Sequence, residues 1–154
     1  LRSDYYNPLD QLLQTETVGE EAFRELTGLG VKWLAKFEEW GVITWEKRGE
    51  DKIYSQDDVI IGKLLVDLDR AGFGPGDGFD MENVKRYVDL FREIVVMSHT
   101  GFLQSNPDNF SPEQNLERGI RGRELMSLFF YHLYRKLIRD ENVRSQAQRK
   151  PTPV

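Results

Sequence analysis

Two glycines that are one residue apart, Gly28 and Gly30, interrupt an otherwise helical stretch of the sequence. Because glycine weakens a helix and lets the chain reverse, this spacing predicts a tight turn between two short helices. The first helix is expected over residues 21–26 and the second over residues 31–40. The apolar positions of the second helix recur at helical spacing, at Val31, Leu34, Phe37 and Trp40.

The segment after the second helix has the pattern of a β-hairpin. Gly41 ends the helix, as glycine commonly does just past the last turn. Residues 42–45 are β-branched and aromatic and are expected to form a strand. Residues 48–51 are typical of a turn, and residues 52–54 are expected to return as the partner strand. Two helices joined by a glycine turn and followed by a hairpin form a winged helix-turn-helix pattern.

The chain resembles the opening of MerR-type transcription regulators at residues 26–43, LTGLGVKWLAKFEEWGVI, where that family typically has LTGVS, two variable residues and TLRYYEELGLI. Residues 54–59, YSQDDV, are similar to the start of that family's third helix, and residues 68–73, LDRAGF, to the end of that helix. The resemblance covers roughly residues 20–95. It implies a mainly α fold, a MerR-like winged helix-turn-helix with a small β-hairpin wing and additional C-terminal helices. It also implies a transcription regulator that binds double-stranded DNA as a dimer on a twofold operator.

The residues expected to contact DNA lie on the second helix and the hairpin. Lys32 and Lys36 are one helical turn apart on the outward side, and Trp33 beside them could pack on a sugar or a thymine methyl. Cations of the hairpin would contact phosphates, which position a protein without reading sequence. The predicted DNA-binding set is Lys32, Trp33, Lys36, Lys47, Arg48, Lys52 and Tyr54. The alternative is a solvated surface with Trp33 half buried and the hairpin cations paired with neighbouring acids.

Three departures support a second hypothesis about function. The formal net charge is -5, whereas a phosphate-binding domain more often carries a positive balance. Ala35 occupies the position of the family's arginine, and the hairpin mixes acids with bases. The second hypothesis is therefore a protein-interaction module that kept a winged-helix scaffold and lost DNA binding.

Two further helices are expected in the same domain. Ser55 and Asp58 begin the first, before a glycine-rich stretch at residues 72–79 that reads as a long turn, with a phosphate loop as the alternative. Its apolar stripe is Ile61, Leu64, Leu65 and Leu68. Asp80 caps the second, which fades by residues 98–101. The apolar face of this second helix is Val84, Tyr87, Val88, Phe91, Ile94 and Val95.

A long C-terminal helix is expected to begin at Ser111 and Pro112 and to end near Asp140. It is apolar on more than one face, which implies two partners. Because MerR-like proteins dimerise through a long C-terminal helix, the resemblance favours a homodimer. An aromatic small-molecule effector and plain core packing are the alternatives. The predicted dimer or effector contacts are Met126, Phe129, Phe130, Leu133, Tyr134 and Leu137.

Four regions follow from these expectations. They are an N-terminal extension over residues 1–19, the MerR-like domain over 20–98, a loop and long helix over 99–140, and a disordered tail over 141–154. The N-terminal extension is expected to be helical, with its helix beginning at Asn7 and Pro8.

Other functional classes find little support in the sequence. The chain has no cysteine, which excludes disulfides and thiolate metal sites. His99 and His132 have no neighbouring histidine or carboxylate at ligand spacing, so neither a metal nor another cofactor is expected. No nucleophile–base arrangement indicates an enzyme. No apolar run approaches the ~20 residues of a membrane span, and no signal peptide is visible, so a cytoplasmic protein is expected.

Overall fold

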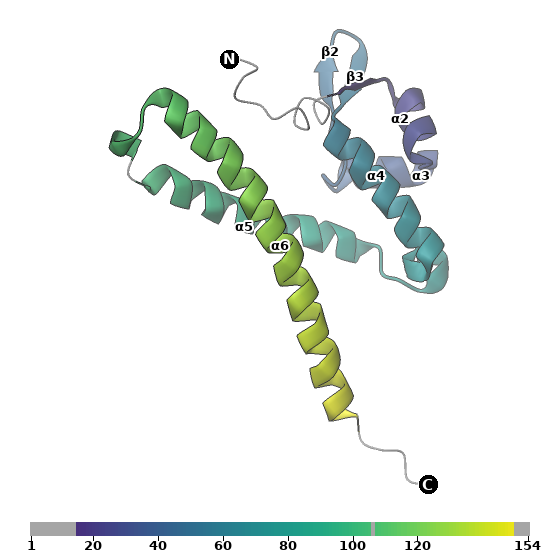
Figure 1. Ribbon diagram of the computed structural model, residues 1–154. Helices are drawn as coiled ribbons and strands as arrows, with labels where there is room; N and C mark the ends of the chain where they lie inside the picture. The colour runs from purple at the N-terminus through teal and green to yellow at the C-terminus, as the bar shows by residue number, and fades with distance from the viewer. Residues whose placement is uncertain (1–14, 106, 150–154) are drawn as a thin grey trace. The chain divides into compact units, whose positions relative to one another are not determined.

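The computed structural model describes residues 15–105 and 107–149, which divide into two units with their boundary between Leu103 and Gln104. The first unit holds a small sheet and four helices (Figure 1). These elements are β1 (Thr17–Val18), α2 (Glu20–Thr27), α3 (Val31–Glu39), β2 (Glu46–Arg48), β3 (Asp51–Tyr54), α4 (Gln56–Leu68) and α5 (Glu82–Gln104). The last of them, α5, ends one residue past the boundary between the units. The second unit holds α6 (Pro112–Gln148). The described chain is therefore mainly helical, as expected.

The three strands form one antiparallel sheet in the order β1-β3-β2. β2 and β3 form a hairpin whose turn, at Gly49 with a φ of 65°, lies within the turn expected at residues 48–51. β1 was not expected from the sequence. It adds only two residues to the other edge of β3, where Thr17 pairs with Tyr54 and Val18 with Ile53.

The turn between α2 and α3 forms where the two glycines predict it. Gly28 ends α2 with a φ of 83°, a left-handed conformation that favours glycine. The Thr27 hydroxyl donates to the Phe23 carbonyl at 2.9 Å and accepts from the Leu29 amide at 3.2 Å, so the turn is fixed from both sides.

The core of the first unit lies between the sheet and the helices. The Phe23 ring of α2 stacks on the Tyr54 ring of β3 with centroids 4.1 Å apart. Leu34 and Phe37 add the inner face of α3, as expected, whereas Val31 at its first position is exposed. The complete buried cluster is Phe23, Leu29, Leu34, Phe37, Val42, Ile43, Tyr54 and Val59.

The strand expected over residues 42–45 is absent, and β2 begins only at Glu46. The amides of Val42 and Ile43 donate instead to the Phe37 carbonyl, at 2.9 and 3.2 Å, and close the end of α3. The Thr44 amide donates to Oδ1 of Asp58 at 3.0 Å. Because these donors are used by neighbouring helices, they are not free to pair in a sheet, whatever the β-propensity of the side chains.

α4 begins at the predicted cap, since Ser55 Oγ accepts from the Asp58 amide at 3.1 Å. The predicted apolar stripe is only partly correct, because Ile61, Leu64 and Leu68 are exposed. The buried side of α4 instead carries Asp58, Val59 and Gly62, with Leu65 and Val66 half buried against the core. Apolar residues surround this helix, so their spacing alone does not select the face that packs.

The glycine-rich stretch after α4 forms no strand and no long helix. It contains a π-helical turn at Asp69–Phe73 and a 3-10 turn at Pro75–Asp77. This agrees with the long turn that the sequence predicts. Asp80 then accepts from the Glu82 amide at 3.0 Å and caps α5 as expected.

α5 and α6 both extend further than predicted. α5 continues through residues 98–101 to Gln104. On its expected apolar face Val84 and Val88 pack against the core, while Tyr87, Phe91 and Val95 are exposed. α6 starts with the predicted capping box of Ser111 and Gln114 but continues past Asp140 to Gln148, so residues 141–148 of the expected disordered tail are helical.

Two expectations fall outside the described residues, namely the helix beginning at Asn7 and Pro8 and the last five residues of the tail, 150–154. Within residues 15–105 and 107–149, no helix is long and apolar enough to cross a membrane.

Candidate nucleic-acid interface

The outward face of α3 carries two exposed lysines. Lys32 and Lys36 are one helical turn apart, and both are exposed, while Leu34 is fully buried on the opposite side of the helix. Lys36 Nζ lies 3.6 Å from Glu39 Oε2, but both side chains are about half exposed or more, so water screens this pair. Lys32 Nζ lies 5.5 Å from the centre of the Trp33 ring. Both ammonium groups therefore remain accessible to a large anion.

Trp33 was predicted to project from this face toward DNA, but it does not project freely. It is half buried and packs against the core. Its ring centre lies 5.8 Å from that of Phe37 and 6.5 Å from that of Trp40, within the range for aromatic pairs. The position of Trp33 is therefore half buried, as in the alternative, with its ring covering the edge of a small core.

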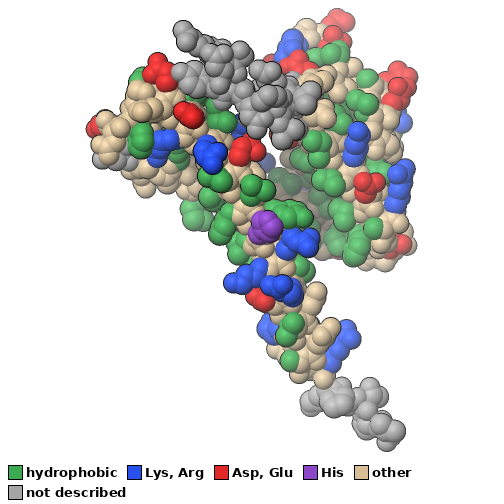
Figure 2. All heavy atoms as spheres, viewed as in Figure 1, with side chains coloured by type: hydrophobic (Ala, Val, Ile, Leu, Met, Phe, Trp, Pro, Cys, Tyr) green, Lys and Arg blue, Asp and Glu red, His purple; other side chains and the backbone are tan. Residues whose placement is uncertain are grey.

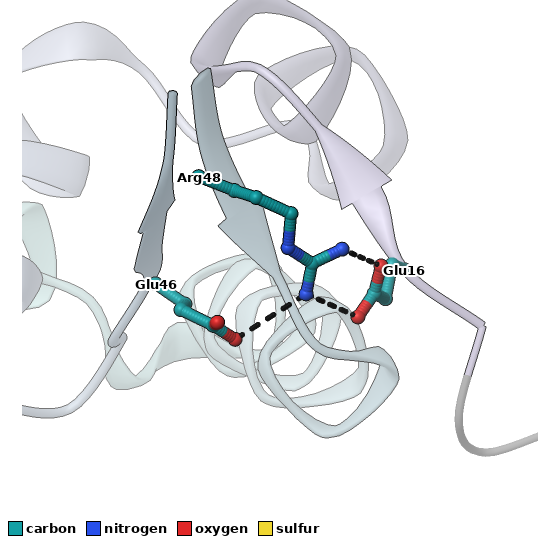
Figure 3. Close-up of polar contacts among 3 residues, drawn as sticks. All are labelled: Glu16, Glu46 and Arg48. Carbon is teal, nitrogen blue, oxygen red and sulfur yellow. Dashed lines mark hydrogen bonds and ion pairs between the residues drawn. The ribbon is translucent and has the colours of Figure 1, made fainter. Parts of the chain in front are cut away.

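Arg48 is not free, because carboxylates on two sides hold its guanidinium (Figure 3). Its Nη1 and Nη2 donate to the two oxygens of Glu16 at 2.8 and 3.0 Å, and Nη2 also lies 3.4 Å from Glu46 Oε2. The hydrogen bonds from the Arg48 guanidinium hold the pKa of the Glu16 carboxyl below its ordinary value. The predicted phosphate contact is therefore occupied by acids of the same unit.

Lys52 is similarly engaged. Its Nζ lies 3.4 Å from Glu38 Oε2 and 3.9 Å from Glu20 Oε2. The same ammonium sits 4.7 Å from the centre of the Trp45 ring, a cation–π distance. Lys47, on the neighbouring strand, is exposed and has no ion pair with any described residue. Of the three hairpin cations, Lys47 is thus the one that the described residues leave available.

Tyr54 was predicted to contact DNA, and its position contradicts this. The side chain is fully buried, and its hydroxyl donates to Glu38 Oε1 at 2.7 Å. Burial and the bond to Glu38 raise the pKa of the phenol far above its ordinary range. Tyr54 stabilises the core beneath α3 and cannot reach a ligand at the surface.

The sequence did not reveal the carboxylates that pair with the hairpin. Glu16 lies 32 residues from Arg48, and Glu38 lies 14 residues from Lys52. Neither spacing follows a helix or hairpin rule, so only the fold brings them together. The hairpin's own acids are Glu46, Glu50 and Asp51, and of these Glu46 contacts Arg48.

A shallow surface groove borders α3 on the side of the glycine-rich turn. It has a volume of about 370 Å³. Lys32, Lys36 and the two half-buried tryptophans form one wall, and residues 75–82 the other. Its complete lining is Lys32, Trp33, Lys36, Trp40, Pro75, Phe79, Asp80, Met81 and Glu82. The two lysines therefore face solvent on one side and, across the groove, the acidic residues Asp80 and Glu82 on the other.

The predicted dimer or effector contacts lie along the middle of α6, where hydrophobic side chains reach the surface (Figure 2). Phe129 is 54% and Tyr134 is 67% exposed, so the second unit itself does not cover these large rings. Phe130 and Leu133 are partly buried. The exposed members of the predicted set are Met126, Phe129, Tyr134 and Leu137.

Across the part of the chain that the structure describes, no three His, Asp or Glu side chains group as metal ligands. No family model matches the chain, and neither the curated proteins nor the solved structures include a significant match.

Proposed function

We propose that this chain is a MerR-like transcription regulator whose winged helix-turn-helix binds duplex DNA, with two copies acting on a twofold operator. The order α2, glycine turn, α3, hairpin and α4 agrees with the arrangement of such a motif. The observation that carries the proposal is the pair Lys32 and Lys36, exposed one turn apart on the outer face of α3. In this arrangement α3 is the reading helix.

The start of α3 favours an anion as well. Gly30 precedes the helix and offers no side-chain cap to the first-turn amides. The N-terminal end of a helix carries unpaired amide donors and a partial positive charge, both of which favour a phosphate. Lys32 lies in this same first turn. Phosphate contacts at this end would orient the rest of α3 along the major groove.

The hairpin supports weak rather than strong binding. Lys47 is available, whereas Arg48 and Lys52 are paired with carboxylates. Each cation that neutralises a phosphate releases counterions and adds to affinity. With few free cations, the complex is expected to be weak and to form only at low salt, and its affinity should fall gradually as salt rises.

The exposed apolar surface of α6 supports a homodimer. Phe129 and Leu137 would each leave water on association, and burial of large apolar side chains drives most permanent interfaces. A twofold dimer would present two copies of α3 to DNA, about 34 Å apart for half-sites separated by one turn of the helix.

The test is the fluorescence anisotropy of a labelled duplex carrying the DNA upstream of the protein's own gene, measured in about 50 mM salt. The proposal predicts saturable binding, weakened by Lys32→Gln with Lys36→Gln. The matched control, Lys63→Gln with Lys136→Gln, removes the same charge from exposed positions on α4 and α6 and is expected to bind as the wild type does. Absence of binding by the wild type would overturn the proposal.

A second candidate function is a protein-interaction module on the same scaffold. The ion pairs of Arg48 with Glu16 and of Lys52 with Glu38 favour it, because they neutralise most of the hairpin. Absence of DNA binding at low salt, together with a stoichiometric protein partner, would select this function over the first.

A further inference from the structure

The hairpin's arginine is engaged by a residue that belongs to neither hairpin strand. Glu16 immediately precedes β1, and its side chain reaches the Arg48 guanidinium with two hydrogen bonds of 2.8 and 3.0 Å (Figure 3). A carboxylate that accepts two parallel bonds from an arginine matches the guanidinium geometry in the way that a phosphate does. Glu16 therefore occupies the donors that Arg48 would offer to DNA.

A second carboxylate, that of Glu46, lies on the same face of the sheet as Arg48. Successive side chains of a strand point to opposite faces, so Glu46 and Arg48 share a face of β2. Glu46 also lies 3.4 Å from Arg48, so two carboxylates surround one guanidinium and the local charge is negative. A polyanion that approaches Arg48 would first meet this negative charge.

The segment that holds Glu16 in place is small. β1 contributes two residue pairs to the sheet, and Gly19 adds one further bond, from its amide to the Lys52 carbonyl at 2.8 Å. Thr17 is buried, but Val18 is largely exposed. With so few contacts to other described residues, a short edge strand is expected to have low local stability and to open at lower cost than the core.

The pair itself can also exchange. About half of each side chain is exposed, and ion pairs in such a position contribute little to stability because water and salt compete for both partners. Glu16 therefore lowers the affinity of Arg48 for a phosphate without abolishing it.

From these observations we propose that Glu16 regulates the DNA affinity of the hairpin by competing with phosphates for Arg48. When β1 leaves the edge of β3, Arg48 becomes a phosphate contact; when β1 is paired, Arg48 is neutralised. This inference rests on the proposed DNA-binding function and adds its regulation. It applies to Arg48 in particular, because Lys52 is held by carboxylates of α2 and α3 instead.

The experiment compares the wild type with Glu16→Gln, which keeps the size of the side chain and removes its charge. Binding to a labelled duplex of about 30 base pairs is measured by anisotropy from about 50 to 200 mM salt. Glu16→Gln is expected to bind severalfold more tightly. Its plot of log affinity against log salt should steepen by about 0.9, the value for one more phosphate contact.

Two further variants make the result specific. Glu117→Gln on α6 makes the same change of net charge at an exposed position and should bind as the wild type does. In an Arg48→Gln background, Glu16→Gln should no longer increase affinity, because the coupling of the two sites requires both partners. Thermal unfolding of each variant shows whether the fold is retained.

The outcomes separate this inference from the proposed function. Equal binding by the wild type and Glu16→Gln would overturn the role of Glu16 and leave DNA binding in place. A gain that persists in the Arg48→Gln background would also overturn it. Binding by Glu16→Gln with none by the wild type would support competition between Glu16 and DNA for Arg48, but would overturn DNA binding as the function of the wild-type chain. Absence of binding by every variant would overturn the proposed function, and the regulation with it.

Discussion

The Tyr54 hydroxyl donates a 2.7 Å hydrogen bond to Oε1 of Glu38, which joins β3, the central strand of the sheet, to α3. The other oxygen of the same carboxylate receives Lys52 at 3.4 Å. Beneath these contacts the Phe23 ring stacks on Tyr54. Glu38 therefore fixes the position of α3 relative to the hairpin, and so fixes where the lysines of α3 lie.

Tyr54→Phe is expected to destabilise the first unit by about 1–3 kcal/mol, the cost of removing a buried donor from a charged acceptor. The ring and its stacking on Phe23 are kept, so the loss reports on the hydrogen bond. Urea unfolding measures the change in free energy. Tyr87→Phe, at an exposed position on α5, is the control and should remain within about 0.5 kcal/mol of the wild type. Equal stabilities of the two variants would contradict this role of Tyr54.

The stability of the wild type should also fall at high pH relative to Tyr54→Phe. Burial, followed by the bond to Glu38, raises the pKa of the Tyr54 phenol in the folded state. The unfolded chain releases the same proton near pH 10, the ordinary value for tyrosine. The folded state thus holds the proton to higher pH, so its contribution is complete below about pH 10 and is lost as the pH rises further. Unfolding curves from about pH 8 to 11 test this, and a constant difference between the two proteins across that range would contradict it.

Gly62 permits the close approach of α4 to α2. A Cβ at this position would meet Thr27 Cγ2 at 2.7 Å and Leu29 Cδ1 at 3.3 Å. Gly62→Ala should therefore cost about 1–3 kcal/mol through overpacking, despite the better helix propensity of alanine. Gly101→Ala on α5 meets nothing within 4 Å and should stabilise by up to about 1 kcal/mol. Thermal unfolding of both variants measures the contrast, and a gain in both would show that the α2–α4 contact is looser than described.

Sequence patterns that involve only neighbouring residues predicted helix ends and turns correctly. The cap at Ser55, the capping box of Ser111 and Gln114 and the turn at Gly28 each depend on residues within a few positions of one another. Such signals act in the same way wherever the segment lies in the fold. The order of helices and the hairpin in the first unit could be predicted on this basis.

The expectations that failed depend on contacts between distant segments. Thr44 was expected in a strand, but its amide bonds to Asp58, 14 residues away. Tyr54 was expected at the surface, but the packing of Phe23 and Glu38 buries it. The pairing of Arg48 with Glu16 likewise depends on β1, which is too short to carry a strand pattern. In each case the sequence gives the side chain's chemistry, while its partner is set by the fold.

The dimer proposal predicts a particular mass in solution. Light scattering should give twice the 18.0 kDa of one chain for the wild type. Phe129→Ser with Leu137→Ser removes two exposed apolar side chains from the predicted surface of α6 and should shift the mass to that of one chain. Val143→Ser, also exposed on α6 but outside the predicted set, is the control and should leave the mass unchanged. A wild type with the mass of one chain would contradict the proposal.

The salt dependence of DNA binding tests most directly whether the lysines of α3 contact phosphates. Each phosphate contact contributes about 0.9 to the slope of log affinity against log salt. Lys32→Gln with Lys36→Gln should therefore flatten that slope by about 1.8 relative to the wild type. A slope equal to that of the wild type would show that these two lysines do not meet DNA, and would contradict α3 as the reading helix.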